Sequence, residues 1–140
     1  MKKTILLFVM ALAFSLTNAQ EKEISVAAYQ NLDSDFADVL VEMKITDTKN
    51  INYVVGTTLS RGVDKTVYGG IGYSLKDKNI NLTPSIIVGT GFSDNLFYGF
   101  DGNLDININK WLSIGGKLRY IKEDAKEFAP NYYAGLKIRL

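Results

Sequence analysis

Residues 96–108 read LFYGFDGNLDINI, and the alternation in this stretch decides the fold. Apolar side chains occupy every second position from Leu96 to Ile108 except at Gly102, while the positions between them carry mostly glycine, asparagine and aspartate. A period of two is typical of a β-strand whose two faces meet different surroundings. The stretch therefore predicts a strand with one apolar face and one polar face.

The same period continues through most of the chain on both sides of this stretch, with turn-forming residues about every ten residues. The breaks are short, so consecutive strands are expected to pair antiparallel. The sequence predicts an all-β fold of about eight strands in a closed antiparallel up-and-down barrel. The expected strands are Ile24–Gln30, Phe36–Thr46, Ile51–Ser60, Val63–Leu75, Ile80–Thr90, Leu96–Ile108, Leu112–Ile121 and Tyr132–Leu140.

Residues 32–45 also allow a helix. One helical stripe would hold Leu32, Phe36, Val39, Leu40 and Met43. One strand face would hold Ala37, Val39, Val41, Met43 and Ile45. The strand is favoured because its short flanking turns suit an antiparallel neighbour, but the pattern leaves the helix open.

The N-terminus resembles a secretory signal peptide. Lys2 and Lys3 precede an apolar stretch at residues 5–16, and Ala19 offers a small residue for cleavage. We expect residues 1–19 to be removed and residues 20–140 to form the barrel domain. Cleavage would remove two of the 16 basic residues and leave 14 against 15 acidic ones. This balance argues against a nucleic-acid partner.

Composition excludes several kinds of site. The 140 residues contain no cysteine and no histidine, which excludes disulfides, Ser-His and Cys-His nucleophiles and the usual zinc sites. Asp101-Gly-Asn-Leu-Asp105 resembles the start of a calcium loop, but the sixth and twelfth positions hold Ile106 and Leu112. We therefore expect no metal, no cofactor and no enzymatic activity.

Alternation alone does not say which face points inward. A soluble ligand-binding barrel places its apolar face inside, whereas a membrane barrel places it against lipid. Glycine discriminates, because it weakens a solvated strand but fits where side chains crowd inside a narrow barrel. Three glycines, Gly69, Gly102 and Gly116, fall on the apolar face. Seven fall on the polar face: Gly56, Gly70, Gly72, Gly89, Gly99, Gly115 and Gly135.

Charges on the polar face are nearly balanced, as a buried interior requires. If residues 109–111 form a three-residue turn, Asp101 faces Arg119 and Asn103 faces Lys117 across the flanking strands. We expect these side chains to form a charge network inside the barrel. The predicted network consists of Asp38, Glu42, Asp101 and Asp105 with Lys44, Lys117, Arg119, Lys137 and Arg139.

Aromatic residues of the apolar face fall near the strand ends, where membrane barrels carry interfacial belts. Tyr53, Tyr73 and Trp111 lie near one set of ends; Tyr98, Phe100, Tyr120 and Tyr132 lie near the other.

Two features depart from the simple pattern. Pro84 lies inside an expected strand and predicts a bulge or a local break, because it has no N–H to donate. Four apolar residues, Leu40, Val54, Ile87 and Ile121, fall on the polar face and argue against a wholly aqueous channel.

Together these features resemble the small eight-stranded outer-membrane barrels of the OmpA and OmpX type. The final residues, YYAGLKIRL, alternate as the last strand of that family does, although Leu140 stands where an aromatic residue is more common. The resemblance implies a monomer in the bacterial outer membrane, whose partners are lipid and the barrel-assembly machinery that recognises the C-terminal strand. The expected function is a structural envelope role, with a narrow pore or a surface contact as elaborations. The alternative is a soluble exported barrel that binds a small apolar ligand.

Overall fold

The structure is a computed structural model that describes residues 23–33, 39–59, 65–91, 95–123 and 127–140. The expected signal peptide lies outside these ranges. No helix among the described residues is long and apolar enough to span a membrane. The strands are β1 (Glu23–Asn31), β2 (Val39–Thr46), β3 (Ile51–Leu59), β4 (Thr66–Tyr73), β5 (Leu75–Asp77), β6 (Ile80–Gly91), β7 (Leu96–Asn107), β8 (Leu112–Glu123) and β9 (Ala129–Arg139).

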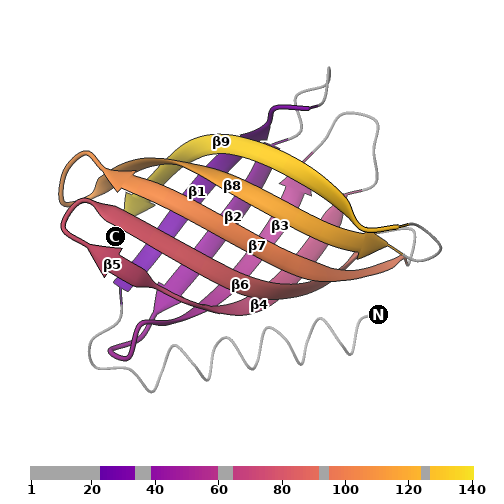
Figure 1. The fold of residues 1–140 in the computed structure, drawn as a ribbon, viewed down its shortest axis with the longest axis horizontal. Helices are drawn as coiled ribbons and strands as arrows, with labels where there is room; N and C mark the ends of the chain where they lie inside the picture. The colour runs from indigo at the N-terminus through magenta and orange to yellow at the C-terminus, as the bar shows by residue number, and fades with distance from the viewer. Residues whose placement is uncertain (1–22, 34–38, 60–64, 92–94, 124–126) are drawn as a thin grey trace.

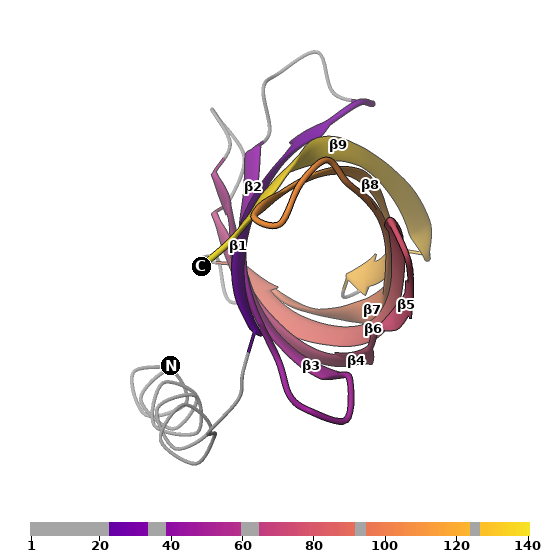
Figure 2. The same ribbon diagram turned by 90° about the vertical axis from the view of Figure 1, so that its left-hand side faces the viewer.

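The strands form one closed antiparallel barrel. The sheet order is β4-β3-β2-β1-β9-β8-β7-β6-β5, and a further pairing between β4 and β6 closes the ring. Figure 1 shows the tilted strands from the side, and Figure 2 looks along the barrel at the ring. The first and last strands lie side by side, with Ser25 opposite Arg139. Among the described strands only the short β5 keeps a free edge, because it pairs with β6 alone, and the closed ring confirms the predicted up-and-down barrel.

β4 and β5 are one strand interrupted at Ser74. Both pair with β6 in one continuous register, which places Tyr73 opposite Pro84. We attribute the interruption to Pro84, because its nitrogen has no hydrogen to donate. Of the two outcomes predicted at Pro84, the structure has the local break and not the bulge. The barrel therefore has eight strands around its circumference.

The described residues 39–45, for which the sequence allowed a strand or a helix, belong to strand β2. Residues 39–46 pair with β1 on one side and β3 on the other, with Glu42 between Ala27 and Gly56. The helix is wrong for this segment, because both of its edges are bonded in the sheet. Residues 34–38 lie outside the described ranges.

The two ends of the barrel differ in their connections. At the end that we call the turn end, β2–β3, β5–β6 and β7–β8 join through short turns, and β1 begins where β9 finishes. In the first turn, Asp47 Oδ1 accepts hydrogen bonds from the N–H groups of Lys49 and Ile51, at 2.8 and 2.9 Å. Asn50 has a φ of 62°, a conformation that asparagine tolerates. The opposite end is called the loop end.

The apolar face points outward. Large hydrophobic side chains are exposed on every strand except β2, among them Ile86, Phe100 and Leu136. Glycine confirms the assignment, because a Cβ built on Gly135 would lie 2.1 Å from the carbonyl oxygen of Ala28, whereas one on Gly102 meets nothing within 4 Å. Glycines of the polar face therefore stand where the crowded interior excludes larger side chains.

Candidate functional site

The lumen is the candidate site, because most of the polar and charged side chains that the sequence singled out point into it. Of the nine residues in the predicted charge network, Asp38 lies outside the described ranges. Seven others are almost completely buried, and Arg139 is partly exposed at the turn end. The structure divides them into separate groups along the barrel.

Four of these residues form the group that we call the central cluster: Glu42, Asp101, Lys117 and Arg119. Arg119 donates to both oxygens of Asp101, from Nε at 2.8 Å and from Nη2 at 2.7 Å. Lys117 donates to Asp101 at 3.0 Å and also contacts Glu42. The register places Asp101 opposite Arg119 and Asn103 opposite Lys117, as the three-residue turn predicted. The Glu42 contact joins β8 to β2, which are not neighbours in the sheet.

Tyr68 completes the central cluster, although the sequence did not single it out. Its hydroxyl donates to Glu42 Oε2 at 2.6 Å, and the Arg119 guanidinium lies 4.0 Å from its ring centroid. The register places Gly56 and Gly89 on either side of Tyr68. A Cβ on Gly56 would lie 2.3 Å from the ring. The signal in the sequence is thus a large polar-face aromatic residue flanked by glycines on both neighbouring strands.

The loop-end part of the lumen is filled by apolar side chains that we call the loop-end plug: Leu40, Ile87, Phe97, Ile121 and Tyr133. Leu40 and Ile87 are 0% and 1% exposed. The ring of Phe97 packs against Tyr68 with centroids 6.4 Å apart. Three of the four apolar exceptions on the polar face, Leu40, Ile87 and Ile121, therefore pack together at this end, while the fourth, Val54, is buried opposite Lys44. Their packing agrees with the expectation that the lumen is not a wholly aqueous channel.

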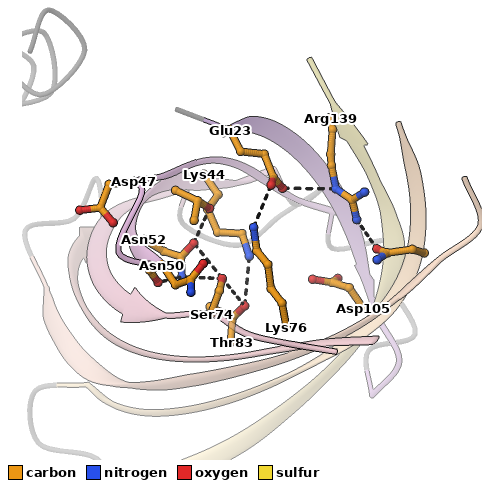
Figure 3. Close-up of polar contacts among 12 residues, drawn as sticks. Glu23, Lys44, Asp47, Asn50, Asn52, Ser74, Lys76, Thr83, Asp105 and Arg139 are labelled. Carbon is orange, nitrogen blue, oxygen red and sulfur yellow. Dashed lines mark hydrogen bonds and ion pairs between the residues drawn. The ribbon is translucent and has the colours of Figure 1, made fainter. Parts of the chain in front are cut away.

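The turn-end part is polar. A series of side-chain hydrogen bonds, the polar chain, runs from Thr46 to Asn52 (2.6 Å), from Asn52 to Ser74 (2.8 Å), from Ser74 to Thr83 (3.4 Å) and from Lys44 to Thr83 (3.3 Å). Figure 3 shows four of these side chains, Lys44, Asn52, Ser74 and Thr83, converging on the lumen from β2, β3, the β4–β5 junction and β6. The side chains of the polar chain all lie at inward-facing positions of their strands.

Ion pairs span the mouth of the barrel at the turn end. Oε2 of Glu23 accepts a hydrogen bond from the Nζ of Lys76 at 2.9 Å (Figure 3). Oε1 of Glu23 lies 3.3 Å from the Nε of Arg139. Glu23 and Lys76 were not in the predicted network. The alternation of the sequence predicts that both side chains point inward. It does not predict that they form an ion pair, because β1 and β5 are not adjacent in the sheet.

The two remaining network cations behave differently. Lys137 pairs with Asp105. Lys44 has no Asp or Glu oxygen within 4.0 Å among the described residues, so the expected pairing does not extend to it. No grouping of three or more Asp or Glu side chains that could hold a metal ion occurs in the part of the chain that the structure describes.

The predicted interfacial aromatics lie on the outer surface. Tyr53 is half-buried, and the other six are exposed: Tyr73, Tyr98, Phe100, Trp111, Tyr120 and Tyr132. Phe128 joins this set without having been singled out. It stacks on Tyr120 with centroids 5.1 Å apart and meets Tyr98 edge-on at 6.0 Å.

Solved structures with the same fold identify its class. A barrel from the de novo design of transmembrane β-barrels matches with a TM-score of 0.69 at 10% identity, covering 88% of this chain and 98% of its own. The Yersinia pestis outer membrane protein Ail, solved in a phospholipid bilayer nanodisc, matches with a TM-score of 0.61 at 13% identity over 86% of this chain and 100% of Ail.

The fold is that of a small transmembrane β-barrel. A second designed barrel, TMB2.3, agrees with a TM-score of 0.62 at 14% identity, over 85% of this chain and 93% of the design. Neither a protein-family model nor a curated protein matches the sequence. At these identities the likeness concerns the fold alone.

Proposed function

We propose that this chain is a non-enzymatic, monomeric barrel of the bacterial outer membrane with a structural role in the envelope. The observation that carries the proposal is the inverted arrangement of its faces. Among the described residues, an apolar outer surface encloses a lumen with seven almost fully buried charged side chains. An outer surface of this kind is unstable in water and stable against hydrocarbon.

The soluble ligand-binding alternative needs the opposite arrangement of faces. It would place Ile86, Phe100 and Leu136 around a cavity, but these side chains are 60%, 58% and 54% exposed. The structure argues against this alternative, because the apolar residues inside the described barrel pack against one another in a cluster.

The contents of the lumen favour a structural role over conduction. The loop-end plug and the central cluster follow one another along the barrel and join strands from opposite sides of it. Arg119, held by two hydrogen bonds to Asp101, would have to move before hydrated ions could pass. The partners of such a barrel are outer-membrane lipid around its circumference and, during assembly, the machinery that would receive β9.

Envelope fractionation combined with electrophoresis tests this proposal. We expect the protein in the outer-membrane fraction and a faster SDS-gel mobility for unboiled than for boiled samples, because a closed barrel resists SDS until heated. A known periplasmic protein in the same cells controls for leakage between fractions. Recovery of this protein in the soluble fraction without detergent would contradict the proposal.

A further inference from the structure

Three exposed lysines occupy equivalent positions in the three turns at the turn end: Lys49, Lys78 and Lys110. In each turn, the carbonyl of the residue after the lysine accepts a backbone hydrogen bond from the next strand of the sheet. These bonds join Ser74 N to Asn50 O (2.8 Å), Asn107 N to Asn79 O (2.7 Å) and Arg139 N to Trp111 O (2.8 Å). The three turns are therefore anchored in the same way, and we call these lysines the lysine ring.

The lysine ring is spread around the barrel and does not converge on one point. Its turns join β2 to β3, β5 to β6 and β7 to β8, so further strands separate them along the sheet. Figure 2 shows these turns at different points around the mouth. A partner that meets all three lysines must therefore surround the barrel, as membrane lipid does.

The ammonium groups of the lysine ring have no counter-charge within the protein. None of them has an Asp or Glu oxygen within 4.0 Å among the described residues. The nearest acidic residues in the sequence bind backbone instead. Asp47 accepts the N–H of Lys49, and Asp77 accepts the N–H of Lys78, both at 2.8 Å. Lys110 shares its turn, residues 108–111, with no acidic residue. The three side chains are thus available to an anion outside the chain.

The lysine ring lies at the edge of the apolar outer surface. Trp111 directly follows Lys110 and is 58% exposed. Ile80 lies two residues after Lys78 and is 49% exposed, and Tyr73 on the same outer face is 46% exposed. In membrane barrels, aromatic side chains mark the interface, and lysines extend their ammonium groups beyond it into the headgroups. With the apolar face against hydrocarbon, the lysine ring lies at the level of the lipid phosphates.

The distribution of charge favours the turn end for contact with an anionic surface. Segments 47–50, 76–79 and 108–111 at the turn end carry four basic and two acidic residues. Segments 32–38, 60–65, 92–95 and 122–128, which connect the strands at the loop end, carry four basic and eight acidic residues. An anionic bilayer surface attracts the first set of charges and repels the second.

We propose that the lysine ring binds the phosphate groups of anionic phospholipids, of the phosphatidylglycerol class, in the leaflet at the turn end. Each lysine meets a separate headgroup, because the turns are distributed around the barrel. One lysine at an anionic lipid surface gives about a fivefold preference. The inference rests on the proposed function, since it requires the barrel in a bilayer, and it adds the lipid class and the end of the barrel that selects it.

Trp111 makes the proposal measurable, because it is the single tryptophan of the chain and directly follows Lys110. The protein purified from the envelope is reconstituted in phosphatidylcholine vesicles. These contain the same small fraction of acyl-brominated phosphatidylglycerol or acyl-brominated phosphatidylcholine, and bromine quenches the tryptophan that it contacts. We expect quenching that corresponds to about a fivefold preference for phosphatidylglycerol, reduced at high salt. Equal quenching by the two lipids would overturn the inference, whereas no quenching by either would contradict the bilayer location itself.

Matched variants assign the preference to the lysine ring. Lys110→Gln should reduce the preference at Trp111 to nearly one, because it removes the adjacent cation. Lys122→Gln, which removes a cation near the loop end, should leave the preference unchanged. A preference that survives in Lys110→Gln would overturn the site.

Moving the reporter tests a second member of the ring. Combining Trp111→Phe with Ile80→Trp places the single tryptophan two residues after Lys78, on the exposed outer face. The preference for phosphatidylglycerol should persist at this position, disappear on addition of Lys78→Gln and remain on addition of Lys110→Gln. Loss of the preference on moving the reporter would contradict equivalent sites around the barrel.

Discussion

The two halves of the lumen are filled by different kinds of side chain. The loop-end half packs apolar side chains, and Phe97 and Tyr68 fit because glycines such as Gly89 leave room beside them. The turn-end half relies on hydrogen bonds and leaves polar atoms such as Asn81 Oδ1 without a hydrogen-bond partner among the described residues. Between the two halves lies the central cluster, where charges are fully paired. A single period-two pattern thus encodes an interior whose character changes along the barrel axis.

Removal of Arg119 should have the largest effect, because it breaks the boundary between the two halves. Arg119→Ala leaves Asp101 and Glu42 with one shared cation, and we expect a loss of about 3–5 kcal/mol in the free energy of unfolding. Urea unfolding in detergent, followed by circular dichroism, measures it. Lys110→Ala is the control, because Lys110 is exposed in a turn and should change stability little.

The double variant sharpens this result. In the double variant Asp101→Ala, Arg119→Ala, the loss in the free energy of unfolding should be smaller than the sum of the two single losses. Each single variant leaves the other residue of the pair buried without its partner, and the double variant removes both. Additive effects would contradict the pair.

The plug comes next. Leu40 is completely buried, and Leu40→Ala should cost about 2–5 kcal/mol by removing apolar burial and leaving a cavity. Leu104→Ala is the matched control on the outer face, where the side chain is 49% exposed and detergent can fill the space. Equal losses for the two variants would mean that the loop-end half is not packed as described.

Glycine substitution compares inside with outside at a smaller scale. Gly135→Ala forces a Cβ to within 2.1 Å of a backbone oxygen and should cost about 1–3 kcal/mol by overpacking. Gly102→Ala meets open space and should be neutral or slightly stabilising. The same urea titration distinguishes them, and a destabilising Gly102→Ala would argue against the assigned faces.

The smallest effect is expected in the turn-end half. Thr83→Val removes the hydroxyl that links Lys44 to Ser74, and we expect a loss of about 1 kcal/mol. The loss is expected to be small because a single hydroxyl is removed from the polar chain. A loss as large as that of Leu40→Ala would contradict the difference between the two halves of the lumen.

The sequence predicted what depends on alternation and adjacency. The faces follow from period two and glycine placement, and the contact of Asp101 with Arg119 follows from turn length, because these residues lie on neighbouring strands. At Pro84 the sequence predicted either a bulge or a local break, because a missing N–H is compatible with both. The structure has the break, with the register unchanged across it.

Contacts across the lumen could not be predicted in the same way. Lys117 meets Glu42 across 75 residues of sequence, and Lys76 meets Glu23 across 53, on strands that are not neighbours. These meetings depend on strand tilt and barrel closure, which no local pattern specifies. The sequence likewise could not predict that Lys44 has no carboxylate partner among the described residues. The number of charges on the polar face shows that they nearly balance, but not which side chains pair.

Spin-label accessibility tests the central claim, that the apolar face meets lipid, most directly. The chain has no cysteine, so single cysteines at Gly102 and Gly116 can be labelled uniquely, and both positions have room outside the barrel. In lipid bilayers we predict frequent collisions with oxygen, which partitions into hydrocarbon, and few with a water-soluble nickel chelate at both sites. Stronger relaxation by the nickel chelate than by oxygen at these positions would contradict the account.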